Sequence, residues 1–226
     1  MTTRATRHLI EVSAISDITA WYRRISFDPL GLFGFYRPAP AAYLMLTVPT
    51  LDGQGRVQRA YSLVGQPGQT CAFDFVLHHP VGPASQWAAQ AEPGRRLAVT
   101  EPPYHLAIPP VGHATIIGDT SAVAAIGSLL AGLDPAMSAT VLLEDDHPDR
   151  DRLPLPQRDR TTIRWIDRLS PADLAEAATA APTDRFIWAA GERHLTRLAK
   201  DYARDQDLPR ANQAIQTYWI AGTAAG

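Results

Sequence analysis

The sequence predicts a chain of the β-barrel plus α/β class, with two domains in its 226 residues. Residues 1–108 contain short β-branched and aromatic runs separated by Gly- and Pro-rich turns, a pattern typical of an antiparallel barrel or sandwich. From residue 109 onward, apolar strand-like runs alternate with helical segments, which indicates a parallel sheet covered by helices. We therefore predict one domain at residues 1–108 and a second at residues 109–226.

Composition and charge argue against several classes of function. The formal net charge is −2 and both signs are interspersed, so we expect no nucleic-acid partner. The single cysteine, Cys71, rules out an intrachain disulfide or a cluster held by several cysteines, fits a reducing compartment, and is expected to be inert. The seven histidines lack the spacing of a zinc site, so we predict no metal centre.

The sequence also lacks recognisable targeting signals. Its first residues have no apolar core of the kind found in signal peptides, and no run approaches the roughly 20 apolar residues that span a bilayer. We therefore expect a cytoplasmic protein without membrane insertion. The oligomeric state is left open.

Turn-forming residues divide the first domain into short strands. A loop rich in Pro, Gly and aromatic residues covers residues 29–40, while Asp52–Gly55 and Gln66–Gly68 form tight turns. The strands expected between these turns cover residues 8–13, 18–28, 43–48, 57–64, 71–78 and 96–101.

The stretch from Phe73 to Trp87 carries the strongest local signal in the chain. Its first half is β-branched and aromatic and predicts a strand, after which Pro80 and Gly82 turn the chain out of the sheet. Pro83 is suited to the first turn of a helix over residues 83–88. A fresh helix N-terminus presents amide groups and a partial positive charge, which favours a phosphate or pyrophosphate.

The second domain is expected to alternate strands with helices. Thr120 and Ser121 are predicted to cap a helix that Gly132 ends, and Ser170 is predicted to cap another that begins with Pro171. Ligands of such parallel sheets bind at the carboxyl ends of the strands. The expected strands cover residues 113–119, 140–144, 162–166, 185–188 and 214–219, the helices cover residues 122–131, 171 onward and 193 onward, and residues 150–160 form a charged loop.

Five segments, in order, resemble the siderophore-interacting protein family of FAD-containing ferric-siderophore reductases, which are related to ferredoxin–NADP reductases. These segments are Arg59-Ala60-Tyr61-Ser62, Asp74–His78 with Gly82–Ala88, Gly118–Ala122, Trp188–Glu192 and Tyr218–Gly222. The resemblance implies a six-stranded antiparallel Greek-key FAD-binding barrel followed by a parallel-sheet nucleotide-binding domain. It also implies FAD as cofactor, NADPH or NADH as electron donor, and a ferric siderophore or another small molecule as acceptor. The flavin would take a hydride and pass single electrons to Fe(III).

The same resemblance assigns roles to individual residues. Arg59 would pair with an FAD phosphate, while Tyr61 and Ser62 would lie at the isoalloxazine as catalytic residues. The other residues implied to bind the cofactor are Asp74, His78, Gly82, Ala84, Ser85, Trp87 and Trp219. The residues implied to bind the nicotinamide nucleotide are Asp119, Thr120, Gly191, Glu192, Arg193 and Arg197.

The sequence departs from the family pattern at two positions. Val64 stands where the family often has Arg, which puts one phosphate or substrate contact in doubt. Thr120 replaces the Glu of the Gly-Asp-Glu-Thr-Ala segment, which puts nicotinamide affinity in doubt. The chain also ends soon after Trp219, without the longer C-terminal helix that in the family accompanies ferredoxin as donor, so a nicotinamide donor is favoured.

Each functional interpretation has a structural alternative. His78 and His79 are adjacent on a strand and point to opposite faces, so at most one is functional. Asp119 and Thr120 could serve only as helix caps, and Trp219 could be a core residue. The alternatives for the remaining residues are a strand-edge charge at Arg59, a strand aromatic at Tyr61, an exposed helix face at Arg193 and Arg197, and solvated charges at Arg23, Arg24, Arg95 and Arg96.

Two other functions compete with ferric-siderophore reduction. The chain could be a flavin-dependent reductase or pathway enzyme with a substrate other than iron. Alternatively, it could be a non-redox binding protein built on the same scaffold. Binding of FAD and its reduction by NAD(P)H distinguish these possibilities.

Overall fold

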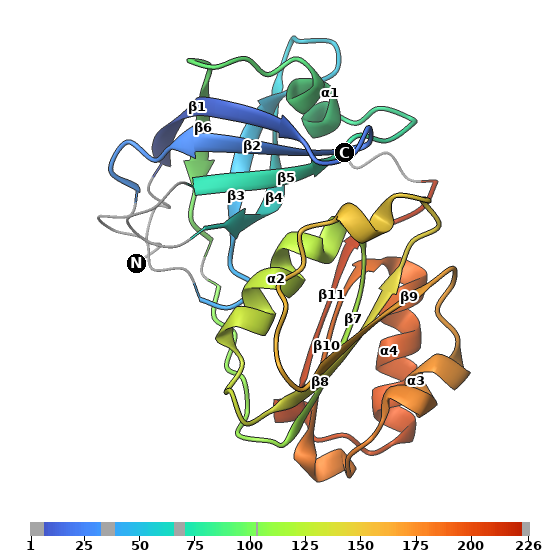
Figure 1. The fold of residues 1–226 in the computed structure, drawn as a ribbon. Coiled ribbons are helices and arrows are strands. Elements are labelled where there is room, and N and C mark those ends of the chain that lie inside the picture. The colour runs from blue at the N-terminus through green and yellow to red at the C-terminus, as the bar shows by residue number, and fades with distance from the viewer. Residues whose placement is uncertain (1–6, 33–38, 66–70, 103, 223–226) are drawn as a thin grey trace. The chain divides into compact units, whose positions relative to one another are not determined.

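The structure, a computed structural model, describes residues 7–32, 39–65, 71–102 and 104–222. They form two compact units that meet in the sequence between His105 and Leu106 (Figure 1). The domain boundary between residues 108 and 109 stays a prediction. The expected turn at Gln66–Gly68 and part of the expected loop at 29–40 lie outside the described residues.

The first unit is a closed barrel with the strand order β1-β2-β5-β4-β3-β6, and every neighbouring pair is antiparallel. This order confirms the predicted antiparallel Greek-key barrel and excludes the sandwich. The elements are β1 (Arg7–Asp17), β2 (Tyr22–Asp28), β3 (Tyr43–Pro49), β4 (Arg56–Val64), β5 (Cys71–Val76), α1 (Pro83–Ala89) and β6 (Arg96–Thr100).

Alternating side chains fill the barrel. In β3, Leu44, Leu46 and Val48 are fully buried while the residues between them are half-buried, as the two-residue period of a strand requires. Phe75 of β5 belongs to the same core. Trp87 of α1 packs on it with the ring centroids 5.8 Å apart, so the helix shares the core of the barrel.

The first two strands differ from the prediction. β1 continues to Asp17 instead of ending at residue 13, because it pairs with both β6 and β2 and changes register at a bulge between Val12 and Ala14. β2 begins at Tyr22 instead of residue 18. A tight turn occupies the intervening residues, in which the buried Thr19 accepts a hydrogen bond at Oγ1 from the Trp21 amide.

The second unit is a five-stranded parallel sheet with the strand order β11-β10-β7-β8-β9. α2 covers one face of this sheet, while α3 and α4 cover the other (Figure 1). The strands are β7 (His113–Asp119), β8 (Ser138–Glu144), β9 (Thr161–Ile166), β10 (Arg185–Glu192) and β11 (Gln213–Trp219). The helices are α2 (Val123–Gly132), α3 (Pro171–Ala177) and α4 (Arg193–Asp205), with short 3₁₀ turns η2 (Thr120–Ala122), η3 (Arg150–Arg152), η4 (Pro182–Asp184) and η5 (Arg210–Asn212).

The strand order reverses direction between β7 and β10. From β7 the chain moves outward through β8 to β9, and it then returns to β10 on the other side of β7 and continues to β11. In open parallel sheets, ligands bind beyond the carboxyl ends of the strands at such a switch point. The topology therefore predicts a ligand site at the ends of β7 and β10, where Asp119 and Glu192 lie.

The end of β10 differs from the prediction, whereas α4 begins at Arg193 as predicted. The expected turn at residues 189–192 is part of β10, which runs to Glu192 because it is hydrogen-bonded to β7 on one side and to β11 on the other. Glu192 is itself the cap of α4, since its carboxylate accepts a hydrogen bond from the His194 amide.

The predicted capping by Thr120 and Ser121 is not observed: the capped element is the 3₁₀ turn η2, which precedes α2. Asp119, and not Thr120 or Ser121, supplies the capping side chain, since its Oδ1 accepts a hydrogen bond from the Ser121 amide at 2.9 Å. The short 3₁₀ turn η2 then leads into α2, which includes Gly132 as its last residue. The predicted capping by Ser170 is confirmed, because its hydroxyl and the Asp173 carboxylate form a reciprocal capping box at α3.

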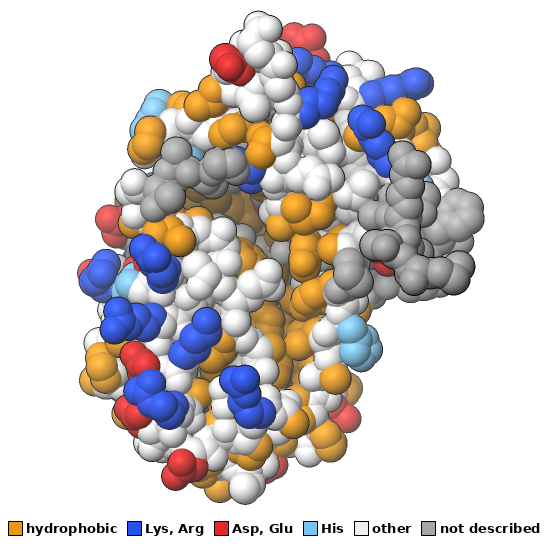
Figure 2. All heavy atoms as spheres, turned by 180° about the vertical axis from the view of Figure 1, so that it is seen from behind, with side chains coloured by type: hydrophobic (Ala, Val, Ile, Leu, Met, Phe, Trp, Pro, Cys, Tyr) orange, Lys and Arg blue, Asp and Glu red, His pale blue; other side chains and the backbone are white. Residues whose placement is uncertain are grey.

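The surface carries both signs of charge. Figure 2 shows acidic and basic side chains interspersed over the face that it presents. Among the described residues, no helix has both the length and the apolar character needed to cross a membrane.

Candidate functional site

β4 brings two of the predicted FAD-binding residues to one face of the barrel. Arg59 and Tyr61 are half-buried and alternate with the exposed Gln58 and Ala60, so their side chains share a face. The Tyr61 ring lies 4.5 Å from that of Phe75, centroid to centroid, and burial raises the pKa of its hydroxyl well above the usual value. Arg59 donates from NH1 to the Gln58 carbonyl at 2.8 Å.

Ser62 lies on the opposite side of the strand from Tyr61. It is 8 % exposed and pairs in register with Tyr43 of β3. The predicted pair of catalytic residues is therefore not brought together on one face. A contact between the Ser62 hydroxyl and the flavin stays a prediction.

Asp74 on β5 is occupied by contacts within the barrel wall. Its two carboxylate oxygens accept from Nε and NH2 of Arg24 at 2.7 and 2.8 Å, and Oδ2 also accepts from the Tyr22 hydroxyl at 3.0 Å. Burial and the neighbouring Asp74 charge raise the pKa of Tyr22 well above its usual value. The predicted contact of Asp74 with the cofactor remains untested, but the structure gives this carboxylate a role in joining β2 to β5.

The other arginine pairs that the sequence singled out are also engaged locally. Arg23 forms a two-pronged bond to Asp17, and Arg96 pairs with Glu11 at 2.8 Å between Nε and Oε2. Arg95 donates to the carbonyl of Gln90. These contacts favour the structural interpretation of both pairs.

The turn before α1 exposes backbone groups. His78 contacts the Pro80 carbonyl through Nδ1 at 2.8 Å, and its ring packs close to Gly82, where an added Cβ would lie 3.6 Å from Cε1. Gly82 is the N-cap and offers no side chain to the first amides of α1. The helix begins at Pro83, as predicted.

The predicted cofactor residues of α1 direct their side chains inward. Ala84, Ser85 and Trp87 are 6, 5 and 5 % exposed, and Trp87 also stacks on Phe27. Contacts of these three residues with the cofactor stay predictions. A half-buried guanidinium, an aromatic ring and uncapped amides at a helix start form a donor set that fits FAD, which combines a pyrophosphate with a planar ring.

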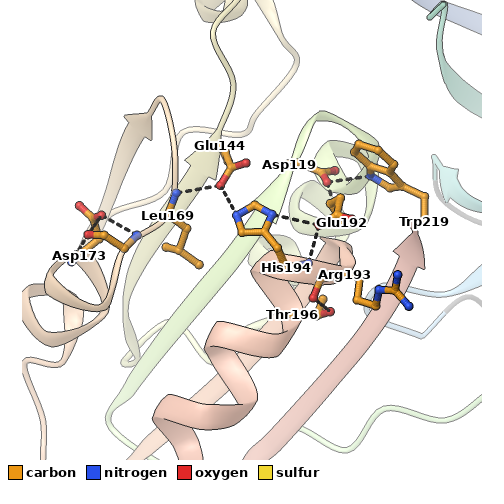
Figure 3. Close-up of polar contacts among 10 residues, drawn as sticks. Asp119, Glu144, Leu169, Asp173, Glu192, Arg193, His194, Thr196 and Trp219 are labelled. Atoms are coloured by element: carbon orange, nitrogen blue, oxygen red, sulfur yellow. Dashed lines mark hydrogen bonds and ion pairs between the residues drawn. The ribbon is translucent and has the colours of Figure 1, made fainter. Parts of the chain in front are cut away.

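In the second unit, the carboxylate of Asp119 gathers the ends of three strands (Figure 3). Its Oδ1 accepts from the amide and the hydroxyl of Ser121 at 2.9 and 2.5 Å. Its Oδ2 accepts from the Glu192 amide at 2.7 Å and from Nε1 of Trp219 at 2.9 Å. β7, β10 and β11 are thus tied together at their carboxyl ends.

A second polar chain runs across the same edge through His194 (Figure 3). Its Nδ1 lies 2.9 Å from Oε2 of Glu192, and its Nε2 lies 3.2 Å from Oε2 of Glu144 at the end of β8. Glu144 also accepts from the Leu169 amide at 2.7 Å, and Glu192 accepts from the Ala221 amide at 2.9 Å. The chain links the ends of β8 and β10 to the segments that follow β9 and β11.

The pKa values of Asp119 and Glu192 are shifted in opposite directions. Burial raises the pKa of Asp119 above its usual value, although hydrogen bonds from Ser121, Glu192 and Trp219 act against this. Burial acts in the same direction on Glu192, but bonds from Ala221 and His194 outweigh it and lower the pKa of that carboxyl. Glu192 is therefore held as an anion by its donors.

Gly191 has the backbone conformation and the empty space that this arrangement needs. Its φ is +140°, a region that other residues rarely adopt, and an added Cβ would lie 2.5 Å from Oδ2 of Asp119. The predicted nucleotide residue Gly191 therefore acts in the structure by admitting the Asp119 carboxylate.

The remaining predicted nicotinamide residues lie beside this edge. Thr120 is half-buried at the start of η2, and Arg193 is exposed at the first position of α4. The Arg197 side chain is 82 % exposed and faces Asp201, with Nε and Oδ2 3.9 Å apart, which favours the interpretation as an exposed helix face. Sequence reasoning named Ser121 only as a helix cap and did not single out Glu144 or His194, although Glu144 ends a predicted strand and could have been included on that ground.

Two family models match the chain. One, described as siderophore-interacting protein, matches residues 111–222, and the other, described as siderophore-interacting FAD-binding domain, matches residues 50–106. The chain belongs to the siderophore-interacting protein family. This confirms the recognition made from the sequence and FAD as the cofactor.

The chain is also similar to individual proteins and to solved structures. It is 30 % identical over 230 residues to the mycobactin import ATP-binding/permease protein IrtA of Mycobacterium tuberculosis, with 97 % of this chain but 26 % of that protein covered. It is 28 % identical to the NADPH-dependent ferric-chelate reductase of Escherichia coli, with 94 and 92 % covered. The siderophore-interacting protein SipS of Aeromonas hydrophila has the same fold, with a TM-score of 0.80, 21 % identity and coverage of 97 and 93 %.

We predict that the stability of the chain depends strongly on Asp74. Replacement Asp74→Ala leaves the Arg24 guanidinium and the Tyr22 hydroxyl without their partner, so we expect the free energy of unfolding to fall by about 3–5 kcal/mol. Asp17→Ala breaks the Arg23 pair at a side chain that is 54 % exposed, and should cost less than about 1 kcal/mol. Urea unfolding of both variants checks this, and equal losses would contradict the burial argument.

A second prediction concerns Gly191. Gly191→Ala forces a Cβ against Asp119 as well as straining the backbone, whereas Gly94→Ala meets only a φ of +83° with nothing within 4 Å. We expect Gly94→Ala to cost about 1 kcal/mol and Gly191→Ala several times more. Thermal and urea unfolding measure the difference. Similar values for the two variants would show that the Asp119 carboxylate does not need this space.

Proposed function

We propose that this chain is an FAD-dependent ferric-siderophore reductase, which moves electrons from NAD(P)H through FAD to chelated Fe(III) and releases Fe(II). The observation that carries the proposal is the combination, in one chain, of an FAD-binding barrel and a parallel sheet with a built polar edge at its switch point. The names of the relatives support it, since one is a ferric-chelate reductase and another a ferric acinetobactin reductase.

The barrel residues would bind the cofactor in three ways. Arg59 would pair with a phosphate of FAD, the amides at the start of α1 would receive phosphate oxygens, and Tyr61 would lie against the planar ring system. When bound, FAD supplies the chemistry of accepting a hydride and giving up single electrons. Arg24, fixed by both oxygens of Asp74, keeps β2 and β5 joined beside these residues.

The carboxyl edge of the parallel sheet would bind the nicotinamide nucleotide. Asp119 and Glu192 have their oxygens committed to neighbouring donors, so they organise the edge. Thr120 offers a hydroxyl, Arg193 a guanidinium and Trp219 an exposed ring, which are the groups left to contact a phosphate-bearing ligand. We propose NADPH or NADH as the donor for this site.

Ferric siderophores are the proposed acceptors because one-electron reduction weakens the hold of a chelate on iron. Siderophores bind Fe(III) through hard oxygen ligands, which hold Fe(II) far less tightly. A cytoplasmic location, where reduced nucleotides are present, would suit this reaction and a chain whose one cysteine is buried.

The proposal is tested with the purified chain, FAD, and an optical trap for ferrous iron under anaerobic conditions. We expect the flavin absorbance to bleach on addition of NADH or NADPH, and ferrous iron to be trapped when Fe(III)-catecholate or Fe(III)-hydroxamate is then added. A flavin that bleaches but yields no trapped iron would assign a different acceptor. A flavin that stays oxidised with both donors, or a chain that takes up no FAD, would refute the reductase.

A variant pair tests the proposed role of Arg59. Arg59→Ala removes a charge-assisted contact to phosphate, so we expect the Kd for FAD to rise about tenfold or more. Arg56→Ala removes an exposed arginine three residues away on the same strand and should leave the Kd unchanged. Fluorescence titration of the apoprotein with FAD gives both values. An equal rise of the Kd in the two variants would show that Arg59 makes no specific contact with FAD and contributes only positive charge.

A further inference from the structure

The Asp119 carboxylate has no capacity left for a ligand. A carboxylate offers about four lone-pair sites, and here its oxygens accept from two donors of Ser121, from the Glu192 amide and from the Trp219 indole. The residue is 7 % exposed. It therefore influences any nucleotide at this edge through the groups that it holds.

The most exposed of those groups is the Trp219 ring. It is 44 % exposed, and it is the only aromatic among the large hydrophobic residues that are exposed in the described part of the chain. β11 is an edge strand, paired only with β10. The backbone hydrogen bonds of the sheet therefore restrain Trp219 from one side only, and the bond from Nε1 to Asp119 restrains the direction in which the indole points (Figure 3).

A register shift aims Trp219 at Asp119. The pairing of β10 with β11 runs from Gly191 opposite Thr217 directly to Glu192 opposite Trp219, so Tyr218 is an extra residue. One extra residue in a strand turns the side chains that follow it to the other face. Without this bulge, Trp219 would point away from the face on which its indole reaches Asp119.

A second tie holds the chain just beyond the ring. The amide of Ala221 donates to Oε1 of Glu192 at 2.9 Å, two residues after Trp219. The two anions at the ends of β7 and β10 thus hold the Trp219 segment from both sides of the switch point. Asp119 and Glu192 are themselves linked by a hydrogen bond, so the contacts that hold the Trp219 ring and the chain beyond it form one connected network.

We propose that Asp119 is a positioning residue: through its bond to Nε1 it holds the Trp219 indole as an aromatic platform for the planar ring of the nicotinamide nucleotide, without touching the nucleotide itself. This proposal rests on the proposed function, because it concerns the donor site of that reaction. It assigns specificity for a flat aromatic ligand to the exposed face of the indole, and it explains why a buried anion is retained at an edge that must receive phosphates. Four neutral donors hydrogen-bond this carboxylate before a ligand arrives, so they take the place of the water that it has lost.

The test combines Asp119→Asn, Trp219→Phe and the double variant. In Asp119→Asn, the side-chain NH₂ group faces the N–H or O–H donors of Ser121, Glu192 or Trp219, so at least one of the present hydrogen bonds is lost. In Trp219→Phe, the aromatic ring is kept but the indole N–H is lost. We expect each single variant to raise the Kd for NAD⁺ or NADP⁺ about tenfold, and the double variant to bind no more weakly than the weaker single variant. The KM for the donor should rise, while kcat at saturating donor should hold.

A spectroscopic readout separates positioning from a general loss of structure. In protein labelled with 5-fluorotryptophan, the ¹⁹F resonance of Trp219 is identified by its absence in Trp219→Phe. We expect Asp119→Asn to move that resonance toward the position of a solvated indole and to leave the other four tryptophans unchanged. Asp145→Asn, which changes a buried carboxyl at the end of β8, serves as the control and should alter neither the resonance nor the Kd.

Three results would overturn the proposal. These are independent, multiplying effects of the two substitutions on the Kd, a loss of affinity in Asp119→Asn with the Trp219 resonance unmoved, or nucleotide binding by Trp219→Phe equal to that of the unaltered protein. The last holds even if Asp119→Asn does not fold. Binding is measured with oxidised nucleotides, so a chain that binds them but is not reduced by NADH or NADPH would refute the proposed function and leave this proposal standing. A chain that binds neither nucleotide overturns both.

Discussion

The arrangement of the parallel sheet depends on a single buried anion, the Asp119 carboxylate. A charge that is removed from water is tolerated only where donors replace the water, and here the donors come from η2, β10 and β11. Satisfying the charge therefore requires three separate elements to end at one point. That point is also where the strand order reverses, which is the position at which open parallel sheets generally bind their ligands.

The neighbours of Asp119 follow from the same constraint. Gly191 must lack a side chain, because a Cβ there would occupy the space of Oδ2. The bulge at Tyr218 must be present, because the indole of Trp219 otherwise faces away. The amide of Glu192 donates to Asp119, while its carboxylate caps α4 and contacts His194. The start of α4 is therefore connected to Asp119 through Glu192.

The barrel also contains a buried aspartate that accepts several hydrogen bonds. Asp74 is buried and receives both prongs of Arg24 together with the Tyr22 hydroxyl, which fastens β2 to β5. In both units a buried aspartate on a strand joins elements that local sequence does not connect. In our proposal, the half-buried face with Arg59 and Tyr61 would bind the cofactor, and the exposed indole of Trp219 would contact the nucleotide.

Much of the fold could be predicted, because it is encoded over short distances. The alternation in β3, the largely apolar centre of β7 and the Ser170-Pro171 cap are each visible within a few residues of sequence. The order of the motifs led to the family and to FAD. The sequence did not reveal contacts whose partners lie far along the chain. β10 runs on to Glu192 because of its two neighbouring strands, and the partners of Asp74 lie about fifty residues away on β2. The saturation of Asp119 could not be foreseen for the same reason, since its indole donor is one hundred residues distant.

The most direct test of this account is amide hydrogen exchange at Glu192. Its N–H lies at the end of a strand next to a bulge, where exchange would ordinarily be fast, and the account requires that the bond to Asp119 protect it. We predict slow exchange of this amide in the unaltered protein and an increase of about tenfold or more in Asp119→Asn, while amides in the middle of β10 stay protected. Fast exchange at Glu192 in the unaltered protein would show that Asp119 does not hold the edge together, and would contradict the account.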